Sequence, residues 1–303
     1  MGFDMFKKIL FATSATEASD HAARVAFNIA RNYQSSLNLF HVMGVPTRGY
    51  SQVVIDVKTK EEVAVDEDYT AWVTEEIKTY YENHLDGSFN YTIDVAVGFP
   101  AREILRQAKI TQPDLILIGG STGDEDESVY KRNSAGSTLQ KVAKAAKCPV
   151  LVVNRPAASF WGGLSSIVFG TDFSKTSDKA FDFAMKVAKA LDCEVNVFHA
   201  IDITPLHTGK MLSQDEIEQK IRESLRKIRA RYEPRLKELK AYSMDVAEGI
   251  PYMEIVKYAR DNLADLIIMA HHSRRVPDED KRLGGNVEQV IVRAGCPVIS
   301  INK

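Results

Sequence analysis

The sequence predicts an α/β protein made of two repeated, doubly wound domains, each a five-stranded parallel sheet with helices on both faces. Short apolar runs such as 115–118 and 266–269 do not alternate with polar residues, which is typical of strands buried on both faces. Amphipathic stretches of helical period lie between these runs, so strands and helices alternate. The third observation is that this order of elements occurs twice.

The repeat is visible at landmarks that keep the same order in both halves of the chain. Residues 8–14 read KILFATS and residues 166–172 read SIVFGTD, at an offset of 158 residues. The offset falls to 151 and then to 148 further along, which indicates duplication with small changes in loop length. The other matched pairs are 37–42 with 195–200, Gly98-Phe99-Pro100 with Gly249-Ile250-Pro251, 114–118 with 265–269, and Cys148-Pro149-Val150 with Cys296-Pro297-Val298.

Each copy is expected to run β-α-β-α-β-α-β-α-β. In the first copy the strands begin with the run 8–11 and with 37–42 and end with 115–118 and 150–153, and a helix follows the first strand. The polar stretches around 66–84 and 213–240 predict second helices with one solvated face. Pro and Gly punctuation indicates a boundary near 154–163. We therefore expect domains at 1–155 and 163–303, joined by a linker at 156–162.

Composition argues against several classes of protein. The chain has 303 residues and a formal net charge of −2, so nothing indicates a nucleic-acid partner. No run approaches the roughly 18 apolar residues of a membrane span, and the first residues lack the apolar region of a signal peptide. The three cysteines form no CxxC pair, so neither a disulfide framework nor a zinc knuckle is indicated. His271 and His272 are adjacent, and adjacent side chains usually point apart, so no metal site is predicted. We expect a cytoplasmic protein that does not insert into membranes.

Candidate binding residues follow the predicted strands of the first copy, at the edge where doubly wound sheets bind ligands. Glycines allow close approach of a phosphate, and the start of a helix offers unpaired N–H groups. The same residues also occur in loops and helix caps without any ligand. The candidates are Ala12, Thr13 and Ser14 after the first strand, Gly119, Gly120 and Gly123 after the fourth, and Gly136, Ser137 and Thr138 at the start of the last helix.

These motifs make the chain resemble a tandem universal stress protein. The nucleotide-binding pattern of that family is Gly-x2-Gly-x9-Gly-Ser/Thr, and the first copy has Gly120-x2-Gly123-x12-Gly136-Ser137. The resemblance implies a five-stranded parallel domain that binds ATP or AMP, with no metal beyond nucleotide-bound Mg. It implies that the loop glycines and Ser137 hold phosphates, while residues 12–14 and Val42 border adenine and ribose.

The second copy departs from this pattern in a complementary way. It keeps the Asp that the family has after the first strand, as Asp172, where the first copy has Ser14. We align Ala270 and Ser273 with Gly120 and Gly123, and a Cβ at these positions would crowd a phosphate. A degenerate second site is therefore expected. Asp172 either contacts a nucleoside or caps the following helix. The residues of this second site are Gly170, Thr171, Asp172, Ala270, Ser273, Gly284 and Gly285.

We predict a stress-response regulatory protein that binds an adenine nucleotide, most favourably in the first copy, without dedicated catalysis or catalytic residues. Two alternatives stay open. One is a scaffold that binds no nucleotide or an apolar ligand, and the other is a slow ATPase or autophosphorylating protein that uses Ser137 or Thr138. The resemblance implies dimers joined through the last strand, so the two copies are expected to form this pseudo-dimer within one chain. A homodimer of whole chains and an unidentified protein partner are left open.

Overall fold

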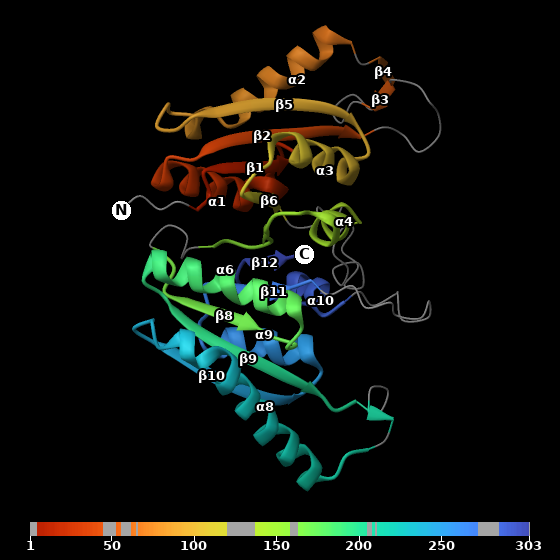
Figure 1. Ribbon diagram of the computed structural model, residues 1–303. Helices are drawn as coiled ribbons and strands as arrows, with labels where there is room; N and C mark the ends of the chain where they lie inside the picture. Colours follow the sequence, from red (N-terminus) through yellow and green to blue (C-terminus); the bar gives the residue numbers. More distant parts are fainter. Residues whose placement is uncertain are drawn as a thin grey trace. The chain divides into compact units, whose positions relative to one another are not determined.

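Figure 1 shows the computed structural model, which describes residues 5–44, 53–55, 62–64, 66–119, 137–157, 163–204, 208–209, 211–271 and 285–302. For residues 53–55, 62–64 and 137 the description covers the backbone alone. The described residues divide into two compact units, of which the first comprises those up to Val153 and the second those from Asn154 onward.

The first unit alternates strands and helices as the repeat predicts. Its elements are β1 (Lys8–Thr13), α1 (Glu17–Tyr33), β2 (Ser36–Gly44), β3 (Val53–Ile55), β4 (Glu62–Ala64), α2 (Glu67–Tyr80), the 3₁₀ turn Glu82–His84, β5 (Tyr91–Gly98), α3 (Pro100–Thr111), β6 (Leu115–Gly119), α4 (Ser137–Ala145) and β7 (Val150–Val153). The antiparallel pair β3–β4 adds to the predicted order and stands apart from the main sheet.

Within its described residues, the second unit repeats the five strands of the main sheet and the four helices. Its elements are β8 (Ser166–Gly170), α6 (Lys175–Leu191), β9 (Glu194–Asp202), α8 (Gln214–Leu236), β10 (Tyr242–Gly249), α9 (Pro251–Asp261), β11 (Leu266–Ala270), α10 (Asn286–Arg293) and β12 (Val298–Ile301). Within the described residues, no helix combines the length and the apolar character needed to cross a membrane.

The main strands of each unit are parallel and follow the same order. In the first unit this order is β5-β2-β1-β6-β7, and in the second it is β10-β9-β8-β11-β12. Numbered within each unit, both orders read 3-2-1-4-5. Successive strands are therefore added on opposite sides of the first strand, and the switch lies between the first and fourth strands. Doubly wound sheets form their ligand crevice at this switch point. This confirms the predicted fold class.

Helices cover both faces of each sheet. In the second unit, Phe169 of β8 contacts Phe181 of α6 and Tyr232 of α8. The next residue, Gly170, faces Ile255 of α9, and successive strand residues point to opposite faces. In the first unit, Phe11 of β1 contacts Phe27 of α1 in the same way. Strands β6, β7, β8 and β11 are buried at every residue except the last residues of β6 and β11, which explains their apolar, non-alternating sequences.

The repeated Gly-x-Pro-x-x-Glu segment forms the turn from the third main strand into the next helix. Gly98 has φ 152° and Gly249 has φ 146°, a region that side-chain-bearing residues rarely adopt. Glu103 and Glu254 lie over these glycines, and a Cβ at Gly249 would come within 2.8 Å of the Glu254 side chain. Proline then opens α3 and α9, where its missing N–H leaves no helical bond unmade.

Candidate functional site

The turns after β1 and β8 form one border of the predicted ligand edge, and a threonine shapes each of them. The Thr13 hydroxyl shares a 2.6 Å hydrogen bond with the Tyr81 hydroxyl and accepts the Ala15 N–H at 2.9 Å. Thr171 does the same, at 2.8 Å to Tyr232 and 3.0 Å to the Phe173 N–H. Both threonines are buried. Their side chains therefore hold the turns in place from inside the protein.

These bonds explain an unusual backbone. The residues that follow, Ala15 and Phe173, have φ 51° and 60°, in the left-handed region that favours glycine. The strain at a non-glycine residue persists only where its surroundings fix the conformation. The threonine hydroxyls provide this constraint, because each accepts the N–H of the strained residue itself.

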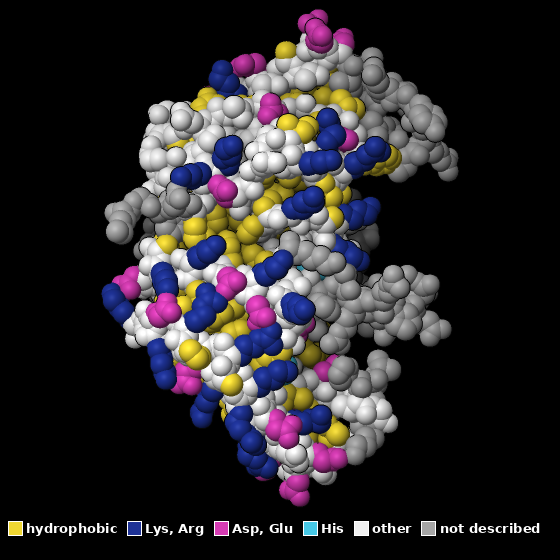
Figure 2. Space-filling model, in the orientation of Figure 1, with side chains coloured by type: hydrophobic (Ala, Val, Ile, Leu, Met, Phe, Trp, Pro, Cys, Tyr) yellow, Lys and Arg dark blue, Asp and Glu magenta, His cyan; other side chains and the backbone are white. Residues whose placement is uncertain are grey.

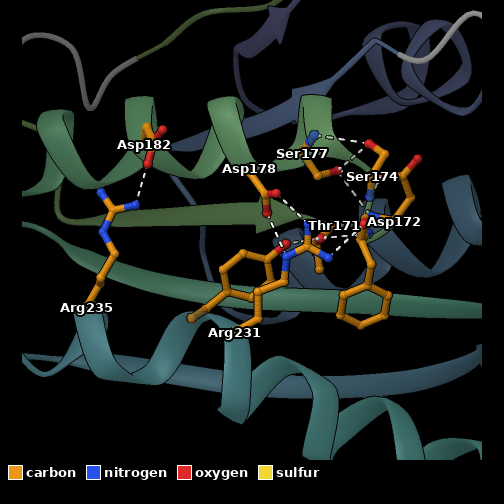
Figure 3. A network of polar contacts seen from close by, with 10 residues as sticks. Thr171, Asp172, Ser174, Ser177, Asp178, Asp182, Arg231 and Arg235 are labelled. Carbon is orange, nitrogen blue, oxygen red and sulfur yellow. Dashed lines mark hydrogen bonds and ion pairs between the residues drawn. The ribbon is translucent and has the colours of Figure 1, made fainter.

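Each turn has an exposed residue between the threonine and the strained residue, Ser14 in the first copy and Asp172 in the second. The two residues differ in charge but bond to equivalent partners. The Ser14 hydroxyl lies 2.7 Å from the Ser19 hydroxyl. Asp172 accepts the Ser177 hydroxyl at 2.5 Å and the Ser174 N–H at 2.9 Å, both through Oδ1 (Figure 3). Ser174 is itself the N-cap of α6. The Ser177 N–H, in the first turn, is accepted by Ser174 and not by Asp172, so Asp172 bonds the cap residue instead of capping the helix itself.

A histidine on the neighbouring strand braces each turn. His41 Nδ1 lies 2.9 Å from the Thr13 carbonyl oxygen, and His199 Nδ1 lies 2.7 Å from that of Thr171. Because a carbonyl oxygen only accepts, Nδ1 carries the proton and donates in both cases. Burial lowers the pKa of both histidines, and the nearby Lys227 ammonium lowers the pKa of His199 further. Both rings are thereby held neutral in a positioning role.

In the second unit, side chains fill the space between the turn after β8 and strand β9. The Phe173 ring lies 4.4 Å from the His199 ring, and Lys227 Nζ lies 4.1 Å from the centroid of Phe173. Arg231 donates to the Phe173 carbonyl oxygen at 2.8 Å and forms a two-point ion pair with Asp178 (Figure 3). The counterparts of Phe173 and Arg231 in the first unit are Ala15 and Tyr80.

The remaining first-unit candidates lie at the same edge of the sheet or outside the described residues. Ala12 pairs with Ile118, so Gly119 at the end of β6 is level with Thr13. A Cβ at Gly119 would lie 3.2 Å from the Ala18 carbonyl oxygen, so this glycine allows α1 to pack against β6. Val42 is half-buried near the end of β2, and Thr138 lies in the first turn of α4. Gly120, Gly123 and Gly136 are not described, and Ser137 is described by its backbone alone.

In the second unit the strand register corrects our alignment of the copies. Gly170 pairs with Met269, so Ala270 is level with Thr171 and is the counterpart of Gly119, not of Gly120. His271 then corresponds to Gly120. The error was one residue, and it arose because the alignment ignored the constant offset of 151 through β6 and β11. Ser273 and Gly284 lie outside the described residues.

A carboxylate closes the start of the last helix in the second unit. The Gly285 N–H donates to Glu288 Oε2, and Glu288 Oε1 lies 3.8 Å from His271 Nε2. The side chains of His271 and Glu288 are only 8% and 13% exposed. This contact brings the end of β11 and the start of α10 together at the predicted phosphate end. The sequence interpretation missed the pair, although a Glu three residues after a helix cap is a recognised signal.

The cysteines lack the features of nucleophiles. Burial raises the pKa of Cys148 and Cys193 to about 11 and that of Cys296 to about 12, so the thiols stay protonated at neutral pH. Across the part of the chain that the structure describes, no group of three or more His, Cys, Asp or Glu side chains could hold a metal ion.

Comparison with known proteins gives the same result for both halves. The universal stress protein family model matches residues 5–154 and again residues 164–302. Universal stress protein MJ0531 of Methanocaldococcus jannaschii is 31% identical over 142 residues, covering 45% of this chain and 81% of that protein. Universal stress protein YxiE of Bacillus subtilis is 29% identical over 157 residues, covering 49% and 99%.

A solved structure matches the chain as a whole. The crystal structure of a universal stress protein from Archaeoglobus fulgidus superposes with a TM-score of 0.69. The alignment covers 98% of this chain and 96% of that one, at 18% sequence identity. At this identity the match supports the fold alone.

Proposed function

Because the chain belongs to the universal stress protein family and carries the family domain twice, we propose that it is a regulatory protein that binds an adenine nucleotide in its first copy. The ligand is ATP or AMP, held without dedicated catalysis. Its phosphates lie at the glycine loop that includes Gly120 and Gly123, and at the start of α4. The nucleoside lies between the β1–α1 turn and the end of β2 near Val42.

The observation that carries this proposal is the difference at the start of the last helix. A helix N-terminus attracts phosphate through its unpaired N–H groups and its positive dipole end. In the second copy the Gly285 N–H already donates to Glu288, whose negative charge also repels an anion. The residue at the matching position of α4 in the first copy is the neutral Gln140. This supports phosphate binding in the first copy and disfavours it in the second.

The residues predicted to border the nucleoside also favour binding in the first copy over the second. Phe173 occupies the position after Asp172, and its ring packs against His199 and under Lys227. Ala15 stands at that position in the first copy and presents only a Cβ. Both ends of the second site are thus occupied by side chains of the protein, whereas the first copy has small or neutral residues at the two matching positions.

Calorimetric titration of the purified chain with ATP and with AMP, in the presence of Mg²⁺, tests this proposal. We expect one nucleotide per chain, and Gly123→Val is expected to abolish binding because a branched side chain replaces a phosphate-cradling backbone. Gly295→Val is the matched control, because a Cβ there meets nothing within 4 Å. Loss of binding in the control, binding unaffected by Gly123→Val, or no binding by the wild type would each overturn the proposal.

The same samples test the absence of catalysis. Nucleotides recovered after long incubation are separated by chromatography, and the protein is weighed by intact mass spectrometry. We expect the bound ATP to be recovered unchanged and the protein to gain no phosphate. Steady release of ADP, or a phosphate on Ser137 or Thr138, would show an enzyme instead.

A further inference from the structure

The first copy carries a basic surface that nucleotide binding does not use. It consists of six exposed cations on α3, on α4 and directly after α4, and we call it the α3–α4 surface. The two helices pack side by side, and Figure 2 shows Lys and Arg side chains gathered over them. Its cations are Arg102, Arg106, Lys109, Lys141, Lys144 and Lys147.

Little on these helices neutralises this charge. The one carboxylate in α3 is Glu103, which pairs with Arg106 at 2.6 Å, and α4 contains no Asp or Glu. Apolar side chains mark both ends of α3, where Phe99 is 55% exposed and Ile110 is 65% exposed. A surface of this kind suits a partner that combines carboxylates with apolar groups, as a protein does and a nucleic acid does not.

The second copy lacks the surface, so it is not a by-product of the fold. At the three cationic positions of α3, the second copy has Met253, Lys257 and Arg260 on α9. The three lysines of the α4 region become Gln289, Val292 and Gly295. The fold places helices at both positions, but the second copy keeps only two of the six cations, so only the first copy forms the full basic surface.

A complementary surface lies on the opposite face of the same sheet. Helix α2 has four carboxylates, Glu67, Asp68, Glu75 and Glu76, against the single Lys78. All four are exposed, and Asp68, Trp72, Glu75 and Glu76 follow one another at helical spacing along one side. Trp72 is 45% exposed and lies 5.5 Å from the Tyr69 ring. We call this side the α2 surface.

We propose that the chain associates with further copies of itself, with the α2 surface of one chain docked on the α3–α4 surface of the next. Carboxylates of α2 face the lysines and arginines, and Trp72 supplies the large, partly buried aromatic anchor that such interfaces favour. Exposed Trp is also a preferred partner for Arg and Lys through its ring face. The proposal does not depend on nucleotide binding.

Geometry defines the kind of assembly. In each unit the first two helices and the last two cover opposite faces of the sheet, so the two surfaces cannot meet within one domain. A contact between two different surfaces is heterologous, and it leaves one surface of each kind unused at the ends until a ring of chains closes. The assembly therefore grows with concentration beyond a dimer, and it weakens with salt because its charges lie at the protein surface.

Sedimentation velocity of the full chain tests the proposal with two charge-reversal variants. The first is Lys141→Glu with Lys144→Glu, and the second is Glu75→Lys with Glu76→Lys. Wild type is expected to form species larger than one chain at about 100 µM in about 0.1 M salt, and to dissociate in about 1 M salt, where the Debye length falls to ~3 Å. Each variant alone is expected to associate at least tenfold more weakly.

Mixing the two variants gives the decisive result. Each variant supplies the surface that complements the reversed surface of the other, so an equimolar mixture is expected to regain association. Matched controls make the same charge changes in the second copy, as Lys257→Glu with Arg260→Glu on α9 and Glu218→Lys with Glu223→Lys on α8. These controls are expected to associate as wild type does.

Several outcomes would overturn the proposal. Wild type could remain a single chain at the highest concentration, or a control could dissociate as strongly as the test variants. The mixture could fail to recover although both variants fold, as judged by circular dichroism. If only the α3–α4 variant loses association, the acidic partner surface lies elsewhere and the assignment to α2 is wrong.

Discussion

The two copies of the domain share a scaffold and differ at the points where a ligand would touch it. The shared part includes the bond between a buried threonine and tyrosine, Thr13 with Tyr81 and Thr171 with Tyr232. The different part lies around it, where Ala15 and Gln140 are replaced by Phe173 and Glu288. The comparison indicates that the turn after the first strand belongs to the fold, whereas the residues that line it can change without loss of the fold.

The largest expected effect tests the shared part. Tyr81 and Tyr232 are fully buried, so Tyr81→Ala and Tyr232→Ala are each expected to lower the free energy of unfolding by about 3–5 kcal/mol. Urea unfolding followed by circular dichroism measures both. Tyr81→Phe and Tyr232→Phe keep the ring and remove one hydrogen bond, with an expected loss of about 1 kcal/mol. Strongly unequal losses in the two copies would contradict a shared structural role.

The next effect tests the different part. In the Gly123→Val background, replacing Phe173 with Ala and Glu288 with Gln removes the aromatic ring and the carboxylate from the second site. We expect the affinity of the second copy for ATP to rise at least tenfold, or about 1.4 kcal/mol. Calorimetric titration measures the change.

The reciprocal exchange is the matched control for that experiment. Ala15→Phe with Gln140→Glu, made in the otherwise wild-type chain, is expected to weaken binding in the first copy to a similar degree. If binding improves in the second copy while this exchange leaves the first unaffected, the two positions do not decide which copy binds.

A smaller effect on the free energy of unfolding is expected from the side-chain bonds that connect α1 with Tyr80 at the end of α2, and α6 with α8. Arg231 bonds both oxygens of Asp178 and also the Phe173 carbonyl oxygen, while the equivalent Asp20 accepts one 2.9 Å bond from Tyr80. Both pairs are partly exposed, which limits their contribution. We expect Asp178→Ala to cost about 1 kcal/mol and Asp20→Ala about 0.5 kcal/mol or less. Equal losses in urea unfolding would show that the extra bonds of Arg231 do not matter.

The smallest effect is a pH dependence that separates His199 from His41. Burial lowers the pKa of both histidines in the folded chain, and the unfolded value is about 6.5. As the pH falls through about 6.5, the unfolded chain takes up these protons first, so stability declines toward the lower folded-state pKa. His41→Asn and His199→Asn keep a donor near the carbonyl and are expected to flatten this decline.

Lys227 makes that test specific to one copy. Its ammonium lowers the pKa of His199 and has no such effect on His41. Lys227→Met is therefore expected to raise the pKa of His199 alone, as measured by NMR titration of the ring protons. An unchanged His199 pKa, or an equal shift at His41, would contradict the assigned contact.

The sequence was sufficient to predict the elements that repeat and are periodic. Strands such as 115–118 and 266–269 are apolar and occur in both copies, so the fold class and the order of elements along the chain could be predicted. The order of the strands within each sheet came from the structure. Within the described residues, the pair β3–β4 has no counterpart in the second copy, and it involves three residues per strand, so neither the repeat nor the periodicity could reveal it. The contact of Thr13 with Tyr81 spans 68 residues and depends on how α2 packs.

The candidate site was harder to predict because its residues lie in loops, where no period fixes the alignment. Ala270 was matched to Gly120 until the strand register assigned it to Gly119. Thr13 and Thr171 were expected among the binding residues, yet their hydroxyls bond inside the protein. The role of Glu288 depends on its reach back to the Gly285 N–H, a detail that residue type alone does not show.

The duplication itself changes what mutation can do. In an assembly of two identical chains, a substitution such as the Phe at position 173 or the Glu at position 288 would appear in both sites at once, because symmetry repeats it. Here each copy has its own stretch of coding sequence, so one can lose or gain a function while the other keeps it. Evolution of this chain can therefore proceed by division of labour, a route closed to any symmetric pair.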